Sequence, residues 1–469
     1  MGVTGQRRSL GAIDRSFLAQ ERRDVMMHVG ALLEFSPSKE SSADFARDFS
    51  RDLREELAKL ARSVKVEQPW NLRLNHPDML TNPLQAWVAD EHFDLEYHVR
   101  RSALASPGDE RELGSLVSRL HGTPLDFHRP PWEAHFIEGL EKKRFAIYFK
   151  VHHSLIDGYT GMRLLARSLS TDQGDLDTPL FFARSESERT REHDEPAPTL
   201  SALLDAVRDQ IGVAKDIGRA VMKAVRGFRD DGPKLALPLQ APKSILNQKI
   251  SRSRRFATQQ ISVDRIKRVA SAAGGTLNDV VLAICGAALR RFLIELGELP
   301  ERPLVAMVPV NVRPKDDPGG GNAVGAILAS LATHVESPRK CLDAVIVSTR
   351  RAKEQLQGMS KGAIMQYSGL VLAPLMLSFI PGAVGRLRPA FNVVVSNVPG
   401  PETPLYFRGW RLDEMYPLSI PFHGYGLNIT VQTYAGSLNF GFTGCRDTLP
   451  HLQRLAVYSG EVFDEMERG

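Results

Sequence analysis

The spacing of apolar and polar positions divides the chain into two structured halves. In the first half, an apolar run at 28–35 is bounded by polar residues and predicts a strand. Apolar positions three and four residues apart at 42–64 predict a helix. Residues 132–140 and 144–151 alternate in polarity on either side of a short polar turn, a pattern typical of a hairpin.

The second half also mixes helices and strands. Its pattern predicts helices at 263–273 and 278–296, the second of them capped at its N-terminus by Thr276. Six further segments are apolar or alternating and predict strands, at 254–262, 303–312, 326–335, 391–398, 427–434 and 438–444. We therefore expect a mixed α/β protein with an N-terminal domain at 1–180 and a C-terminal domain at 251–469.

The segment between these domains, 181–250, has a different character. Residues 185–198 are charged, contain proline and lack an apolar period, which predicts a linker. Residues 200–228 place apolar side chains at alternating spacings of four and three, with Lys and Arg on the other face. This pattern predicts a basic amphipathic helix that either packs against both halves or binds a membrane surface.

Composition narrows the possible functions. Hydrophobic residues make up 42% and charged residues 25% of the 469 residues, as in ordinary soluble globular proteins. The net charge of +5 is mild, and no basic stripe with interleaved aromatic residues is present, so we do not expect nucleic-acid binding. The three cysteines are far apart and form no CxxC pair, which argues against a zinc ribbon and favours a reducing compartment. The N-terminus has no apolar core of a secretory signal.

The motif HHSLIDG carries the main candidate chemistry. It follows the predicted strand 144–151 directly, so His152 and His153 lie at a strand end. A neutral imidazole is the usual base for taking a proton from a hydroxyl, amine or thiol near neutral pH. Asp157 is placed to hold the turn, pair with a cation or orient an imidazole, and Gly158 permits a close or left-handed backbone approach.

Other catalytic systems are not indicated. The sequence contains no GxSxG, no HExxH, no P-loop and no GxGxxG after a strand. Adjacent histidines in an extended segment point to opposite faces, so His152 and His153 form a poor bidentate metal site and we expect no metal.

The motif HHSLIDG resembles the HHxxxDG motif of the CoA-dependent acyltransferase superfamily. Further segments resemble, in order and over nearly the whole chain, those of the bacterial wax ester synthase/diacylglycerol acyltransferase family. They are LGAIDRSFLAQE around Asp14, RPPWE at 129–133, the pair Asn278-Asp279, NVVVSNVPGP at 392–401 and the segment 427–444. The chain departs from the family pattern at Pro131, the middle of its PLW motif, and at Cys445, where a charged residue is expected.

The resemblance implies two domains of the chloramphenicol-acetyltransferase type with a central channel between them. Acyl-CoA would enter from one face and an alcohol from the other. His153 would act as the general base, His152 would support it, and Asp157 would hold the structure or relay charge. Neither a cofactor nor a metal is implied, because CoA leaves as a product.

The resemblance also implies roles in the second half. Asn278 is expected either to stabilise the oxyanion, since its amide can donate, or to cap a helix together with Asp279. Asp279 is expected near substrate or as a structural residue, and Ser396 and Asn397 are expected to line the path of CoA or of the acyl chain. The uncharged segment 362–385 implies a buried helix along an acyl tunnel or a peripheral membrane contact.

We therefore expect an acyl-CoA-dependent O-acyltransferase that acts on diacylglycerol, on a long-chain alcohol, or on both. We expect it in the cytoplasm, attached peripherally to the inner membrane or to lipid droplets. Two alternatives are a condensation-type enzyme that uses carrier-protein thioesters and a non-catalytic lipid-droplet binding protein. The Asn278-Asp279 pair and the lipid-facing segments argue against the first alternative. The intact His153 and Asp157 argue against the second.

Overall fold

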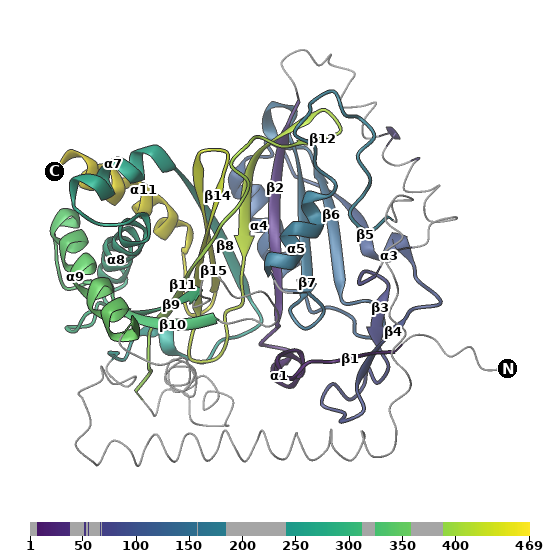
Figure 1. The fold of residues 1–469 in the computed structure, drawn as a ribbon, viewed down its shortest axis with the longest axis horizontal. Coiled ribbons are helices and arrows are strands. Elements are labelled where there is room, and N and C mark those ends of the chain that lie inside the picture. Colours follow the sequence, from purple (N-terminus) through teal and green to yellow (C-terminus); the bar gives the residue numbers. More distant parts are fainter. Residues whose placement is uncertain are drawn as a thin grey trace. The chain divides into compact units, whose positions relative to one another are not determined.

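The computed structural model describes residues 7–37, 51–52, 55, 66, 68–156, 158–183, 241–311, 324–357 and 388–469. The expected basic helix at 200–228, the uncharged segment 362–385 and Asp157 lie outside these residues, as does nearly all of 42–64. Contacts group the described residues into two compact units. The first lies within Met1–Val213 and Pro401–Leu418, and the second within Ala214–Gly400 and Ser419–Gly469 (Figure 1).

The first unit is built on a six-stranded sheet in the order β12-β13-β2-β7-β6-β5. The bounds of these strands are β2 His28–Ser36, β5 Val99–Ala103, β6 Trp132–Glu138, β7 Phe145–His152, β12 Tyr406–Phe407 and β13 Trp410–Leu418. A second sheet pairs β1 (Arg7–Ser9), β4 (Ala86–Ala89) and β3 (Leu72–Leu74) in the order β1-β4-β3. The helices are α1 Ala12–Gln20, α3 Leu95–His98, α4 Glu110–His121 and α5 Gly158–Ala166.

Strand β7 forms the centre of the site-bearing sheet. All eight of its residues are buried. It pairs antiparallel with β6, which confirms the predicted hairpin, and antiparallel with β2 in a register that sets His28 opposite His152. A strand buried on both faces must be covered on both, and α4 covers the face that carries Tyr148. His121, the last residue of α4, shares a 2.9 Å hydrogen bond between its Nδ1 and the Tyr148 hydroxyl.

Strands β12 and β13 come from late in the sequence but belong to the first unit. Strand β13 pairs antiparallel with β2, from Arg411 opposite Ser36 to Leu418 opposite Gly30, with an irregularity between Leu412 and Glu414. The structure thus differs from the expected contiguous C-terminal domain at 251–469. Alternating apolar residues can complete any sheet with a free edge, and the sequence pattern does not say which sheet that is.

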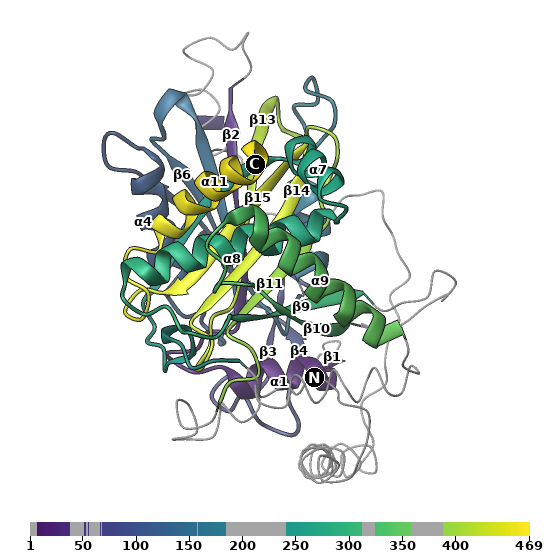
Figure 2. The ribbon, with the colours of Figure 1, turned by 90° about the vertical axis from the view of Figure 1, so that its left-hand side faces the viewer.

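The second unit has one six-stranded sheet in the order β10-β9-β11-β14-β15-β8. Its elements are β8 Arg254–Ser262, α7 Val263–Ala272, α8 Leu277–Glu295, β9 Val305–Asn311, β10 Val324–Ser330, α9 Pro338–Gln357, β11 Val393–Val398, β14 Leu427–Tyr434, β15 Ser437–Cys445 and α11 Gln453–Arg468. Strand β11 runs parallel to β9 and β14, while the other neighbours are antiparallel. The four helices lie together over one face of this sheet (Figure 2).

Local rules account for several of these elements. Strands β14 and β15 are joined by Ala435 and Gly436, both at positive φ (44° and 83°), as a two-residue hairpin requires. Helix α8 is apolar on nearly all sides because it is largely buried, with α7, α9 and α11 packed against it. A Cβ at Gly286 would lie 2.0 Å from the Leu331 carbonyl oxygen, so only glycine permits this close approach.

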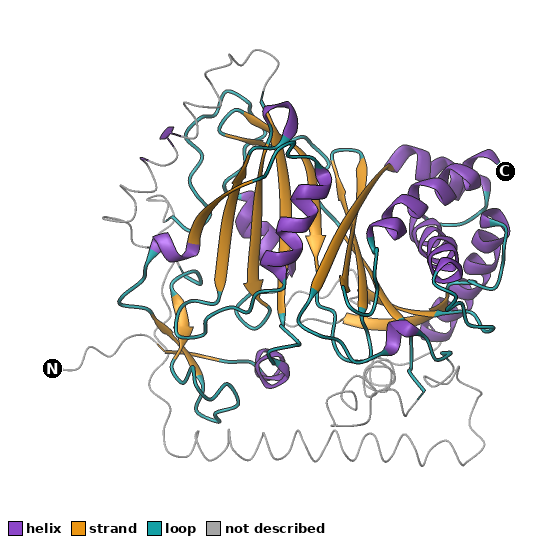
Figure 3. Cartoon of the chain, turned by 180° about the vertical axis from the view of Figure 1, so that it is seen from behind, coloured by secondary structure: helices purple, strands orange, loops and turns teal. Residues whose placement is uncertain are grey.

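Each unit mixes strands and helices (Figure 3), so the expected α/β class with two units is confirmed, while the expected channel between them stays a prediction. Within the described ranges, no single helix has the length and apolar composition to cross a membrane. Helices α7 and α8 meet at a bend of 95° and satisfy that test only when taken together.

Candidate active site

The backbone of the histidine pair is held on both sides at the end of β7. The N–H of His152 donates to the carbonyl of Pro131 at 2.9 Å, and the N–H of His153 donates to the carbonyl of Met27 at 2.9 Å. The RPPWE segment thus braces the strand end through a backbone carbonyl. The departure from the family motif at Pro131 leaves this contact available, because proline keeps its carbonyl.

The ring of His152 is buried in the interior of the first unit. It is 1% exposed, and its Nδ1 lies 2.6 Å from the Ser154 hydroxyl and accepts from the Ser154 N–H at 3.2 Å. An Nδ1 that accepts is unprotonated, so in the neutral ring the proton is on Nε2. This Nε2 lies 3.4 Å from a carboxylate oxygen of Glu21. These contacts and the burial of the ring fit a supporting role for His152.

The ring of His153 has different surroundings. It is only partly buried and stacks on the ring of Phe17, with centroids 4.1 Å apart and an angle of 22° between the planes. Stacking occupies a face of the imidazole. His153 is less buried than His152, which makes it the better candidate to meet a substrate.

The end of the motif is described only in part. Asp157 lies outside the described residues. Gly158 is the first residue of α5 and is exposed, and a Cβ at this position would meet no atom within 4 Å among the described residues. The close backbone approach expected at Gly158 is not seen among the described residues, and its expected place near substrate stays a prediction.

In the second unit, the structure shows how the N-terminus of α8 is capped. Thr276 is the N-cap, and its hydroxyl accepts from the N–H of Asp279 at 3.4 Å. The Asp279 carboxylate accepts from the Thr276 N–H at 2.7 Å and from the Thr349 hydroxyl at 2.6 Å. Asp279 is 3% exposed, and its bond to Thr349 ties the start of α8 to α9. The predicted cap Thr276 is confirmed.

Asn278 stands apart from this cap. Its side chain is exposed, and its Oδ1 accepts from Nδ2 of Asn397 at 2.6 Å. Asn397 is exposed near the end of β11, where the preceding residue, Ser396, is partly buried. Two segments singled out from the sequence thus meet through their side-chain amides. Since Oδ1 of Asn278 is occupied, its Nδ2 is the group turned outward as a donor.

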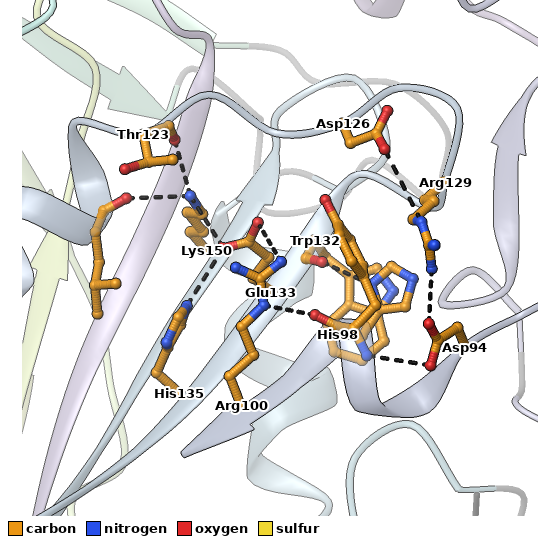
Figure 4. A network of polar contacts seen from close by, with 12 residues as sticks. Asp94, His98, Arg100, Thr123, Asp126, Arg129, Trp132, Glu133, His135 and Lys150 are labelled. Carbon is orange, nitrogen blue, oxygen red and sulfur yellow. Dashed lines mark hydrogen bonds and ion pairs between the residues drawn. The ribbon is translucent and has the colours of Figure 1, made fainter. Parts of the chain in front are cut away.

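A buried charge network joins side chains of β5, β6 and β7 (Figure 4). Lys150 is fully buried and donates to the carbonyls of Leu120 and Thr123 at 3.1 and 2.8 Å, near the C-terminus of α4. Its Nζ also lies 3.2 Å from Glu133. Helix C-termini favour cations, so α4 helps to keep Lys150 charged.

Glu133 is the anion of this network. Besides its contact with Lys150, its carboxylate has one oxygen 3.2 Å from Nη2 of Arg100 and the other 3.3 Å from Nε2 of His135. Burial acts to raise the pKa of Glu133, but the hydrogen bond from His135 and the charges of Lys150 and Arg100 outweigh it and lower this pKa to about 2. Burial lowers the pKa of Lys150, and Glu133 opposes that change. The network therefore has the character of a buried structural ion pair.

Comparisons with known proteins match this arrangement over nearly the full chain. The model of the wax ester synthase/diacylglycerol acyltransferase catalytic domain matches residues 10–281, and that of the C-terminal domain of the same family matches residues 320–467. A Mycobacterium tuberculosis protein named as a diacylglycerol O-acyltransferase is 50% identical over 98% of this chain and 97% of its own. The O-acyltransferase WSD of Acinetobacter baylyi is 38% identical over 98% and 97%.

The comparison with solved structures gives the same match. The wax ester synthase/diacylglycerol acyltransferase from Marinobacter aquaeolei VT8 is 37% identical, with a TM-score of 0.79 over 98% of this chain and 99% of that one. The chain belongs to the wax ester synthase/diacylglycerol acyltransferase family. A condensation domain of the CDA synthetase is 19% identical, with a TM-score of 0.53 over 98% of this chain and 96% of that one, which shows a shared fold.

Two residues at the site of this acyltransferase were not singled out from the sequence. Phe17 and Glu21 both lie in the LGAIDRSFLAQE segment that the family resemblance identified, yet only Asp14 drew attention there. The Asp14 carboxylate accepts from the N–H of Gly11 at 3.1 Å, at the start of α1. The contacts with the histidines come instead from Phe17 and Glu21. The sequence signal that could have pointed to them is the spacing of four positions between the aromatic residue and the carboxylate.

Proposed function

We propose that this acyltransferase moves a long-chain acyl group from acyl-CoA to the hydroxyl of diacylglycerol, of a long-chain alcohol, or of both. The products are triacylglycerol and wax ester. The placement of His153 carries the proposal. Of the two motif histidines, it is the partly exposed one, and its backbone and ring are both held by neighbouring groups.

In the proposed reaction, His153 takes the proton of the acceptor hydroxyl while its oxygen attacks the thioester carbonyl. The tetrahedral intermediate then collapses with loss of the CoA thiolate, which receives the proton from the imidazolium. The ester and free CoA leave, and His153 is neutral again. We propose that Nδ2 of Asn278 donates to the oxyanion, since Oδ1 of this residue is engaged by Asn397. The reaction balances without a cofactor or a metal.

The test is acyl transfer by the purified protein, with thiol release monitored and diacylglycerol and hexadecanol each offered as acceptor. His153→Ala should lower turnover by roughly 10²–10⁴-fold while the protein still unfolds cooperatively. His128→Ala, which removes a histidine with a 62% exposed side chain from the same unit, is the matched control. Wild-type turnover in a folded His153→Ala variant would reject the base. Transfer from a carrier-protein thioester but not from acyl-CoA would favour a condensation-type enzyme.

We also propose that the protein attaches peripherally to the cytoplasmic side of the inner membrane or to lipid droplets. Its proposed substrates are apolar and partition into such phases, so a freely diffusing enzyme would meet them rarely. The uncharged segment 362–385 would supply apolar contact, and the Lys and Arg residues of 200–228 would attract anionic lipid. Stable attachment commonly takes two such signals.

A further inference from the structure

The ring of Phe17 is the described neighbour that lies flat against the candidate base. Its centroid is 4.1 Å from that of the His153 ring, and the planes differ by 22°. Phe17 lies on α1, far from His153 in the sequence, and its side chain is only partly buried. Its ring therefore does more than fill the core, because it forms one wall around the imidazole.

Helix α1 holds this wall firmly. The Arg15 guanidinium donates to the carbonyl of Pro83 at 3.2 Å and to that of Gln85 at 3.2 Å, which ties α1 to the chain leading into β4. Leu18, next to Phe17, is 1% exposed and anchors the helix in the core. Phe17 is thus carried by an element fixed by both polar and apolar contacts.

The chain that follows α1 extends the same contact to the other histidine. A carboxylate oxygen of Glu21 accepts from the Met27 N–H and lies 3.4 Å from Nε2 of His152. The Met27 carbonyl accepts from the His153 N–H at 2.9 Å. Residues 17–27 therefore hold both histidines, and Phe17 is the part that contacts the His153 ring.

We propose that Phe17 is a positioning residue that sets the plane of the His153 imidazole, so that a ring nitrogen rather than the ring face meets the acceptor hydroxyl. This inference rests on the proposed function. The terminal torsion of histidine is broad, and a flat neighbour narrows the range of orientations that a partly exposed ring samples. A base must be within hydrogen-bond reach of its proton, and small misplacements cost up to about 10²-fold in rate.

The decisive variant is Phe17→Leu, which keeps apolar bulk but removes the flat face. We expect kcat to fall by about 10-fold or more, with KM for acyl-CoA and for the acceptor changed less than about twofold. Phe17→Tyr keeps the ring and should retain kcat within about threefold. If Phe17→Leu does not fold, the unbranched Phe17→Met takes its place.

The chain offers a matched control. Phe93 is also partly buried and stacks on a histidine of the first unit, His98, with centroids 4.7 Å apart and planes 5° apart. Phe93→Leu should leave kcat within about twofold of wild type, since His98 has no part in the proposed reaction. Equal losses in Phe17→Leu and Phe93→Leu would reduce the effect to general destabilisation and overturn the inference.

Coupling to the base gives a second readout. In a His153→Ala background, Phe17→Leu should lower the residual rate no further, because the ring it positions is gone. Additive losses would overturn the inference. The imidazole proton signals of His153 should also carry a ring-current shift that Phe17→Leu removes, and this can be measured whatever the activity. Absence of that shift in the wild type rejects the positioning role, whereas a shifted but inactive wild type rejects only the proposed function.

Discussion

Nδ2 of Asn397 donates to Oδ1 of Asn278 at 2.6 Å, between residues 119 positions apart in the sequence. Both side chains are exposed, so the bond adds little to stability. The bond orients the Asn278 amide, because it fixes which end of that amide faces outward. The helix beneath is capped by Thr276 and Asp279 without help from Asn278.

Asn278→Ala should lower kcat by about 10²–10³-fold, the usual effect of losing an oxyanion donor, and should change the melting temperature little. Asn397→Ala should cost less, because Asn278 keeps its donor but loses its fixed orientation. The double variant should be no slower than Asn278→Ala alone. Steady-state kinetics and thermal unfolding of the three variants measure this. An Asn278→Ala protein that is destabilised but has a normal kcat would show that Asn278 has a structural role and is not the oxyanion donor.

Acid should weaken the first unit through Glu133. Its pKa is lowered from an ordinary 4.5 to about 2, so its contribution to stability is complete above pH 4.5 and is lost as the pH falls toward 2. At 1.36 kcal/mol per pH unit, the full loss is about 3 kcal/mol, of which about 2 kcal/mol falls between pH 4.5 and pH 3. Urea unfolding of the wild type between pH 7 and pH 3 measures this part.

The matched variants of this pair separate charge from packing. Glu133→Gln should cost about 3–5 kcal/mol at pH 7, because it leaves Lys150 buried without its carboxylate. Adding Lys150→Met to Glu133→Gln should recover part of the lost stability. The stability of this double variant should also no longer show the fall in acid that comes from Glu133. A Glu133→Gln protein that is as stable as wild type at pH 7 would contradict the buried ion pair.

Acyl transfer should proceed without an acyl-enzyme. Burial raises the pKa of Cys285 and of Cys341 to about 12, so both are protonated thiols near pH 8. Burial acts to raise the pKa of Cys445 as well, but hydrogen bonds with Thr448 and Ser251 lower it below its ordinary value. Intact-mass spectra after mixing with acyl-CoA alone should show no adduct. An adduct that disappears in Cys445→Ala would contradict direct transfer.

Membrane attachment should depend on salt. We expect the protein to sediment with anionic vesicles at 0.01 M salt and to be partly released at higher salt, because the screening length falls from about 30 Å to about 10 Å at 0.1 M. Replacing Lys215, Arg219 and Lys223 within 200–228 by Gln should weaken the low-salt binding. No binding to anionic vesicles at low salt would exclude the attachment.

The control for this test removes the same charge elsewhere. Arg111, Arg119 and Lys267 are exposed on α4 and α7, and their replacement by Gln should leave vesicle binding as in the wild type. Equal losses in both triple variants would point to net charge rather than to the basic segment.

The local elements of this protein could be predicted from short stretches of its sequence. Apolar runs and alternation predicted β2, β6, β7 and β8, and the Thr276 cap of α8 was evident from its residue type. These features depend on periodicity and on hydrogen bonds between residues a few positions apart, which a single stretch of sequence contains. The histidine motif and its place at a strand end were equally visible.

Which distant residues meet depends on how the chain packs, and the sequence pattern does not show it. Nothing in the alternation of β13 says that it completes the sheet of β2, and nothing near His153 indicates that Phe17 lies against its ring. The same holds for Asn278 and Asn397. Such contacts depend on how sheets and helices pack together, and residues far apart in sequence carry no shared period that would reveal them.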